Sequence, residues 1–194
     1  MHLSTFLLKA LANRCSESNA VIHWTQIVHE HGPTVYGAAW RILAHAADAE
    51  DVFQEVFLEA YRMHQTQTVR NWGGLLRRLA ACRSLDRLRQ RKRTTSLHEV
   101  DVAGPDQEPD AALIEQELSD RLRLAIADLP EREAAVFCLR YFEELPNPRI
   151  AEILAISAGA VATALHKARA RLEALLTSNV EPRTSGKREL SHES

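Results

Sequence analysis

The feature that most limits what this chain can fold into is an acidic segment with helix breakers, which lies between two stretches of helical periodicity. Residues 99–120 contain eight acidic side chains and no basic one, and Gly104, Pro105 and Pro109 interrupt any regular element there. On both sides apolar residues recur at steps of three and four, while strand-like alternation is hard to find. We therefore predict an all-α fold in which a flexible acidic linker joins two small helical domains.

The length of 194 residues is enough for two such domains. We place the first domain at residues 20–95, the linker at 96–112, and the second domain, which contains a helix-turn-helix, at 113–176. Residues 1–19 form a leader that we expect to be loose or partly helical, and the polar residues 177–194 form a disordered tail.

Cysteine use and hydropathy favour a soluble protein of the cytoplasm. The three cysteines lie far apart without a CxxC pair, so neither a disulfide framework nor a zinc site is indicated. The apolar run near the N-terminus is interrupted by Lys9 and is much shorter than the ~20 residues that cross a bilayer. We expect no membrane insertion.

A strongly basic segment precedes the linker. Residues 70–93 contain nine basic side chains and one acidic one, Asp86, which we expect near the apolar face in an ion pair or helix contact. A helical wheel places Arg77, Ser84, Arg87 and Arg91 on one side. The alternative to nucleic-acid binding is a solvated, salt-bridged surface, but the segment holds too few anions for it. Phosphates are the ligands that such a stripe favours, and Trp72 at its start can stack on an exposed base.

An acidic run lies on a helix earlier in the first domain. Asp48, Glu50, Asp51, Glu55 and Glu59 lie away from that helix's apolar face. The run either complements the helix dipole or forms a docking face for a basic partner, and periodicity does not choose between the two. We expect this acidic face and the basic stripe to be separate surfaces with separate ligands.

The second domain ends in the spacing of a helix-turn-helix. A short helix, started by Pro148, covers residues 149–154, a three-residue turn follows, and a longer helix with Ser157 as its N-cap covers residues 158–176. Its expected inward face is Val161, Leu165, Ala168, Leu172 and Leu175. Its expected outward face carries Thr163, His166 and Lys167, with Arg169 and Arg171 on the flanks. The alternative is a solvated face on a helical hairpin, which Ala160, Ala162 and Ala164 favour.

Three segments together resemble the extracytoplasmic-function (ECF) group of bacterial sigma factors. They are DAEDVFQEVFLEAYR at 48–62, LLRRLA through LDRLR at 75–89, and LPERE through the arginine and leucine at 171–172. The resemblance covers about residues 22–176 in the family's order. It implies a transcription-initiation subunit that is no enzyme and needs no cofactor or metal.

The resemblance also implies partners and sites. The partners are core RNA polymerase, through its β′ coiled coil and β flap, promoter DNA and an anti-sigma factor, with the linker in the polymerase's nucleic-acid channel. The implied β′ contacts are Glu50, Asp51, Gln54 and Glu55. The implied contacts to the melted −10 element are Trp72, Arg77, Arg78, Cys82, Arg83, Arg87, Arg89 and Arg91. The implied contacts to the −35 duplex are Arg149, Ser157, Thr163, His166, Lys167 and Arg169.

The sequence departs from the family's pattern at several of these positions. Leu75 stands where a Trp is usual, Cys82 replaces an Asn, and Arg149 replaces a Glu. A thiol is a weaker hydrogen-bonding group than an amide, which affects base choice at −10. Alanines at 160, 162 and 164 replace the usual Thr, Lys and Arg of the recognition helix, so we expect weak or unusual −35 recognition.

Two other functions remain open. The first is a free-standing helix-turn-helix regulator that binds palindromic DNA as a dimer. The second is a sigma-like decoy that binds an anti-sigma factor but no promoter.

Overall fold

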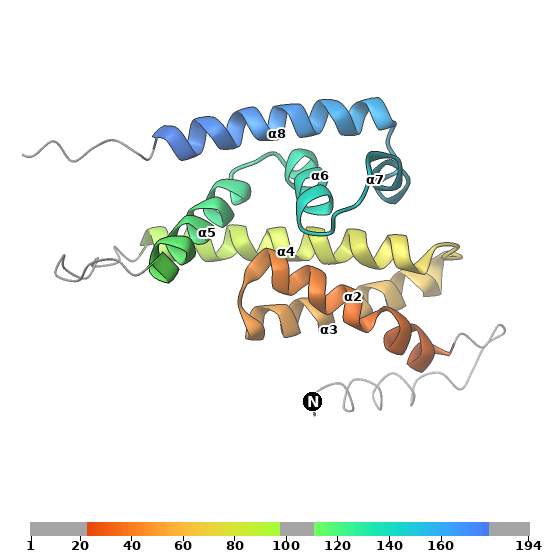
Figure 1. Cartoon of the computed structure of the whole chain (residues 1–194). Helices are drawn as coiled ribbons and strands as arrows, with labels where there is room; N and C mark the ends of the chain where they lie inside the picture. Colours follow the sequence, from red (N-terminus) through yellow and green to blue (C-terminus); the bar gives the residue numbers. More distant parts are fainter. Residues whose placement is uncertain (1–22, 98–110, 179–194) are drawn as a thin grey trace, which may run out of the picture.

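The computed structural model describes residues 23–97 and 111–178, and within these ranges every regular element is a helix (Figure 1). The predicted all-α class is confirmed. The leader at 1–19, most of the linker and most of the tail lie outside the described residues. The helices are α2 (Trp24–Leu43), α3 (Ala46–Thr66), α4 (Trp72–Leu97), α5 (Ala111–Ala127), α6 (Glu131–Tyr141), α7 (Asn147–Leu154) and α8 (Ala158–Ser178).

Helix α4 is the centre of the fold. It packs against α2 and α3 on one side and against α5, α6 and α7 on the other, as Figure 1 shows. The side chains of α4 that are buried between these layers are Leu76, Leu79, Ala80, Ala81, Ser84, Leu85 and Leu88. Because other helices cover α4 from two sides, its buried residues lie on more than one of its faces. The predicted split into one apolar and one basic face is therefore wrong.

Two residues of α4 show the difference most clearly. Ser84, which the wheel placed on the basic stripe, is fully buried, and its hydroxyl has no hydrogen-bond partner among the described residues. Asp86 is exposed instead of lying by the apolar face, and it pairs with Arg83 and Arg89 of its own helix. The expected ion pair of Asp86 is present, but the expected position is not.

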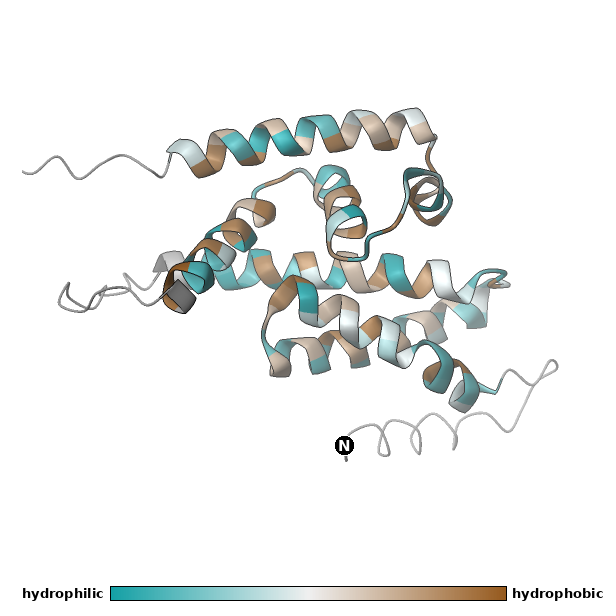
Figure 2. Cartoon of the chain, viewed as in Figure 1, coloured by the Kyte–Doolittle hydropathy of each residue, from teal (hydrophilic) through white to brown (hydrophobic). Residues whose placement is uncertain are grey.

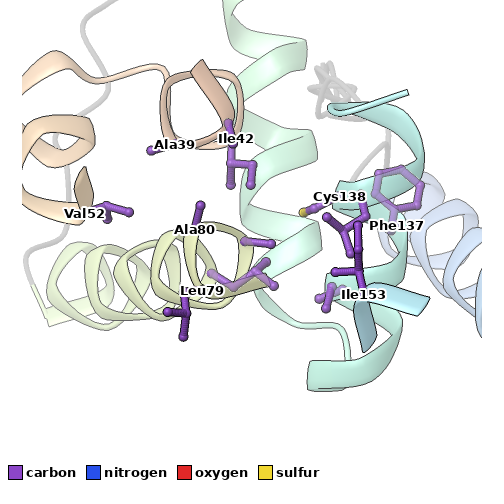
Figure 3. Packing of buried hydrophobic residues seen from close by; sticks show 14 of the residues in the cluster. Ala39, Ile42, Val52, Leu79, Ala80, Phe137, Cys138 and Ile153 are labelled. Atoms are coloured by element: carbon purple, nitrogen blue, oxygen red, sulfur yellow. The ribbon is translucent and has the colours of Figure 1, made fainter. Parts of the chain in front are cut away.

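One apolar core runs through both halves of the chain. In Figure 3, Ala39 and Ile42 of α2 and Val52 of α3 lie on one side of α4, while Cys138 of α6 and Ile153 of α7 lie on the other. The two predicted domains are thus in direct contact in this structure.

The helix-turn-helix forms from local signals. Pro148 sits in the first turn of α7, and Ala155 closes that helix in the left-handed conformation with φ 53°. The Ser157 hydroxyl accepts a hydrogen bond of 3.1 Å from the Ala160 N–H, as expected of an N-cap. The expected inward residues Val161, Leu165, Ala168 and Leu172 are buried, and Leu175 is half-buried.

The first half of α5 projects from the fold. Leu113, Ile114 and Leu118 are each more than half exposed, and in Figure 2 brown hydrophobic bands alternate with teal hydrophilic ones along this end of α5. No single described helix is long and apolar enough to cross a membrane; α7 and α8 meet that criterion only as a pair, bent by 104°.

Candidate functional site

Three arginines of α4, Arg83, Arg87 and Arg91, pair with acidic residues of α3. Arg83 donates to Glu59 from two nitrogens, at 2.8 and 2.6 Å. The Arg87 Nη2 lies 3.0 Å from Glu55 Oε1 and 3.4 Å from Asp51 Oδ2. The expectation that the basic stripe lacks anions is therefore wrong, because the neighbouring helix α3 supplies them.

These pairs join two sets of residues that were expected to have separate ligands. Asp51 and Glu55 are implied polymerase contacts, and Arg87 is an implied DNA contact. Both carboxylate side chains stay half exposed, at 56% and 50%, while Arg87 is 22% exposed. Glu50 is exposed and Gln54 half-buried on the same helix. The acidic face thus remains open to a partner, but the basic stripe is partly neutralised by it.

A second group on α4 faces the C-terminal helices. Arg78 and Cys82 line a cavity of about 480 Å³ whose other walls come from α6 and from the α7–α8 turn. Arg89 donates from Nε to the Ala127 carbonyl at 3.3 Å and from Nη2 to the Leu129 carbonyl at 3.1 Å. The Arg89 guanidinium, which was expected to bind phosphate, therefore donates its hydrogen bonds to backbone carbonyls at and just after the end of α5.

The Cys82 thiol stays protonated at neutral pH. Burial raises its pKa, and the nearby carboxylate of Glu131 raises the pKa further. In this form the thiol is a weak hydrogen-bond donor and acceptor, so it holds no ionic ligand.

The remaining implied −10 contacts are Trp72, Arg77 and Arg91, of which Arg91 also pairs with an acidic residue of α3. The Trp72 ring is half-buried edge-on to Trp24, with centroids 5.2 Å apart. Arg91 lies near the Leu43 carbonyl, at 3.4 Å, and Asp48, at 3.6 Å. Arg77 lies 3.5 Å from the Gly73 carbonyl of its own helix. The eight residues thus point in several directions and form no single surface in this structure.

The outward face of α8 agrees with the sequence prediction better than α4 does. Thr163, His166 and Lys167 are exposed, although the Thr163 hydroxyl donates to the Gly159 carbonyl at 2.9 Å. Ala164 is buried, so its expected place on the outward face is wrong.

Two arginines that are implied contacts of the −35 duplex have partners within the C-terminal half. Arg169 donates to the Tyr141 hydroxyl at 2.6 Å and lies over that ring. Arg149 pairs with Glu152 at 2.6 Å.

Contacts between the two halves are what sequence reasoning missed. Arg41 of α2 pairs with Glu143, and Lys92 of α4 pairs with Asp128. Arg123 of α5 donates to the Ile42 carbonyl at 3.1 Å. Partners more than 30 residues apart leave no local pattern that would have revealed them. No His, Cys, Asp and Glu side chains in the described ranges cluster as metal ligands.

Comparisons with known proteins place these helices in a family. Residues 27–94 match the family model of Sigma-70 region 2, and residues 119–172 match that of Sigma-70, region 4. Among solved structures, CnrH in complex with the cytosolic domain of CnrY shares the fold with a TM-score of 0.50 and 22% identity, over 90% of this chain and 97% of that one.

Curated relatives agree with these matches over most of their length. The ECF RNA polymerase sigma factor SigW of Bacillus subtilis (strain 168) is 30% identical over 162 residues, which cover 77% of this chain and 86% of SigW. The RNA polymerase sigma factor NccH of Alcaligenes xylosoxydans xylosoxydans is 31% identical over 183 residues, which cover 88% and 95%. The chain therefore belongs to the ECF group of the sigma-70 family of RNA polymerase sigma factors.

Proposed function

We propose that this sigma factor divides promoter recognition between α4, which takes the melted −10 strand, and α8, which takes the −35 duplex, while α3 binds core RNA polymerase. The observation that carries the proposal is the N-capped recognition helix α8, whose outward Thr163, His166 and Lys167 are exposed. A helix held at its N-terminus by a short preceding helix is the geometry that enters a major groove. The working domains are residues 20–95 and 113–176.

The α3 contact to the β′ coiled coil uses Glu50, Asp51, Gln54 and Glu55. Half-exposed carboxylates on one helix face complement a basic partner and speed its association. Because Asp51 and Glu55 also hold Arg87, polymerase binding at this face releases Arg87 toward DNA. The β flap is the contact that we assign to the C-terminal domain.

The −10 contact uses the basic residues of α4 with Trp72. Cations follow the phosphates of a single strand and aromatic rings stack on its bases. Arg83, Arg87 and Arg89 bind other protein groups in the free protein, so this role requires them to exchange partners.

The −35 contact is weak because its charged groups are few. Lys167 and His166 supply the polar contacts of α8, while Ala162 supplies only a methyl group. Each missing phosphate contact lowers duplex affinity and flattens its dependence on salt.

The protein works in the cytoplasm, and an anti-sigma factor regulates it. CnrH, which shares the fold, was solved with the cytosolic domain of CnrY. The exposed apolar side chains of α5 form a surface that such a partner would bury.

In vitro transcription tests the proposal. Core RNA polymerase is combined with the full chain on a genomic fragment library, and transcript starts are sequenced. We expect starts downstream of one shared motif. Lys167→Ala should lower the yield several-fold, whereas Lys187→Ala in the tail should leave it unchanged. Binding of specific duplex without polymerase would favour the free-standing regulator, and absence of promoter-dependent transcripts would favour the decoy.

The −10 role is tested separately by permanganate footprinting of melted DNA. Arg78→Gln should reduce the footprint without changing polymerase binding. Arg62→Gln, an exposed residue of α3, is the matched control. Equal loss of melting and polymerase binding in Arg78→Gln would contradict the assignment.

A further inference from the structure

Two cavities beside α4 are lined by basic side chains, and they differ in whether those side chains have partners. One cavity, of about 470 Å³, is lined by Arg89, Lys92, Arg93, Ala127 and Asp128. There the Arg89 guanidinium donates to backbone carbonyls, and Lys92 pairs with Asp128. The protein itself therefore already satisfies the donors of this cavity.

The cavity between α4, α6 and the α7–α8 turn is different. Arg78 of α4 and Arg132 of α6 line it, and neither guanidinium has a hydrogen-bond or ion-pair partner within residues 23–97 and 111–178. Arg78 is half-buried, and a partly buried charge is unfavourable until an opposite charge meets it. Guanidiniums bind phosphate oxygens through paired N–H groups, so this cavity favours a phosphorylated ligand.

The remaining wall of the same cavity is mostly apolar. It comes from Ala135 of α6, Leu154 at the end of α7 and Ile156 in the following turn. Ala135 is buried, and the other two side chains are half-buried. A flat ring gains by packing on such side chains, whereas inorganic phosphate does not. The volume of about 480 Å³ lies within the range of small-molecule sites.

Glu131 supplies a hydrogen-bond acceptor to this cavity. Burial raises the pKa of the Cys82 thiol, Glu131 raises that pKa further and Arg78 lowers it, so both charges lie near this thiol. A carboxylate accepts hydrogen bonds from sugar hydroxyls and from amino groups of a base, while it repels a small anion. Two guanidiniums, one carboxylate and an apolar wall together match the phosphates, sugar and base of a nucleotide.

We propose that the cavity lined by Arg78 and Arg132 binds a free nucleoside diphosphate, with the phosphates on the two guanidiniums and the base against Leu154 and Ile156. The bound nucleotide contacts α4 and α6 at once. This site goes beyond promoter recognition, because it requires neither DNA nor RNA polymerase. A DNA strand carries the same phosphate chemistry, so the experiment separates the two sources.

Isothermal titration calorimetry of the full chain tests the site with four probes in metal-free buffer: ADP, GDP, inorganic pyrophosphate and adenosine. We expect at least one of the two nucleotides to bind with one-to-one stoichiometry, pyrophosphate to bind more weakly, and adenosine to give no heat up to about 1 mM. Absence of binding by both nucleotides up to about 1 mM would overturn the proposal. Pyrophosphate affinity equal to that of the nucleotides would overturn it as well, since the apolar wall would then play no part.

Arg132→Ala tests the phosphate contact. It should weaken nucleotide binding about tenfold, the lower end for a hydrogen bond to a charged group, because Arg132 is exposed. Arg62→Ala removes the same charge from an exposed position of α3 and should leave the affinity unchanged. Equal affinity in the two variants would contradict the site. A tenfold loss in Lys92→Ala instead would place the nucleotide in the other cavity.

Ile156→Ala tests the base contact. It should weaken nucleotide binding about fivefold and leave pyrophosphate binding unchanged, because only the base packs on this side chain. Circular dichroism that matches wild type shows that the variant is folded. Equal nucleotide affinity in wild type and in folded Ile156→Ala would refute the placement of the base.

Single-stranded DNA provides the last comparison. Affinity for a fluorescein-labelled strand of about 20 nucleotides and mixed sequence should be equal in Arg132→Ala and Arg62→Ala. A tenfold loss of DNA affinity in Arg132→Ala would assign the cavity to the strand and reject the free nucleotide as its ligand.

Discussion

The pair between Arg83 and Glu59 offers a measurable link between α3 and α4. The guanidinium donates twice to one carboxylate oxygen, at 2.8 and 2.6 Å, and the two side chains are 38% and 28% exposed. The hydrogen bond to Glu59 also raises the pKa of Arg83, so the guanidinium remains charged. A partly shielded, doubly bonded pair should stabilise more than a fully solvated one.

We expect Arg83→Met to lower the free energy of unfolding by about 1–2 kcal/mol. An exposed ion pair contributes about 0.2–1 kcal/mol and a hydrogen bond to a charged group about 1.5–3 kcal/mol, and this pair lies between those limits. The Met side chain keeps most of the apolar stem, so packing loss is small.

A double-mutant cycle with Glu59→Gln isolates the pair. Urea unfolding of the four proteins, followed by circular dichroism, should give a coupling energy of about 1 kcal/mol. Arg62→Met, on an exposed position of α3, is the control and should change stability by under about 0.5 kcal/mol. Additive effects of Arg83→Met and Glu59→Gln would refute the reasoning, because independent side chains do not couple.

Three further predictions concern backbone, capping and pH. Ala155→Gly should stabilise the fold by about 0.5–1 kcal/mol in thermal unfolding, because relief of left-handed strain at φ 53° exceeds the added unfolded-chain entropy; a loss of stability would contradict this. Ser157→Ala should cost about 1 kcal/mol and Ser157→Gly only a few tenths; equal losses would show that the hydroxyl is no cap. Burial raises the pKa of the Cys138 thiol, so the native state holds its proton more tightly than the unfolded chain. Stability should therefore be constant below the unfolded thiol pKa of about 8.5 and fall above it by up to about 1.4 kcal/mol per pH unit. Cys138→Ala should reduce that slope, and the part that remains should include the Cys82 thiol, whose pKa burial also raises; a slope unchanged in Cys138→Ala would show that Cys138 does not contribute.

The helix-turn-helix was predictable because its signals are local. Pro148 starts one helix, Ser157 caps the next, and a period of 3.6 residues places Val161, Leu165 and Leu172 inward. Each of these signals acts within a few residues, so no knowledge of distant segments was required.

The environment of α4 was not predictable in the same way. Counting charges along residues 70–93 finds one anion, yet Asp51, Glu55 and Glu59 meet these arginines from a neighbouring helix. Ser84 looked like a surface residue because a wheel assumes one buried side, whereas this helix has two. Contacts between helices depend on how the chain is arranged in space, and a single sequence does not record that arrangement.

The position of α4 between two layers of helices also limits which substitutions this protein can accept during evolution. Ala80 and Ala81, in the middle of α4, are small side chains that are buried at 0% and 2% exposure. A larger residue there disturbs two packing arrangements at once, while the same change on the outer side of α8 disturbs none. Deep mutational scanning should find the middle of α4 the least tolerant stretch of the chain, and an outer surface free to acquire new promoter preferences.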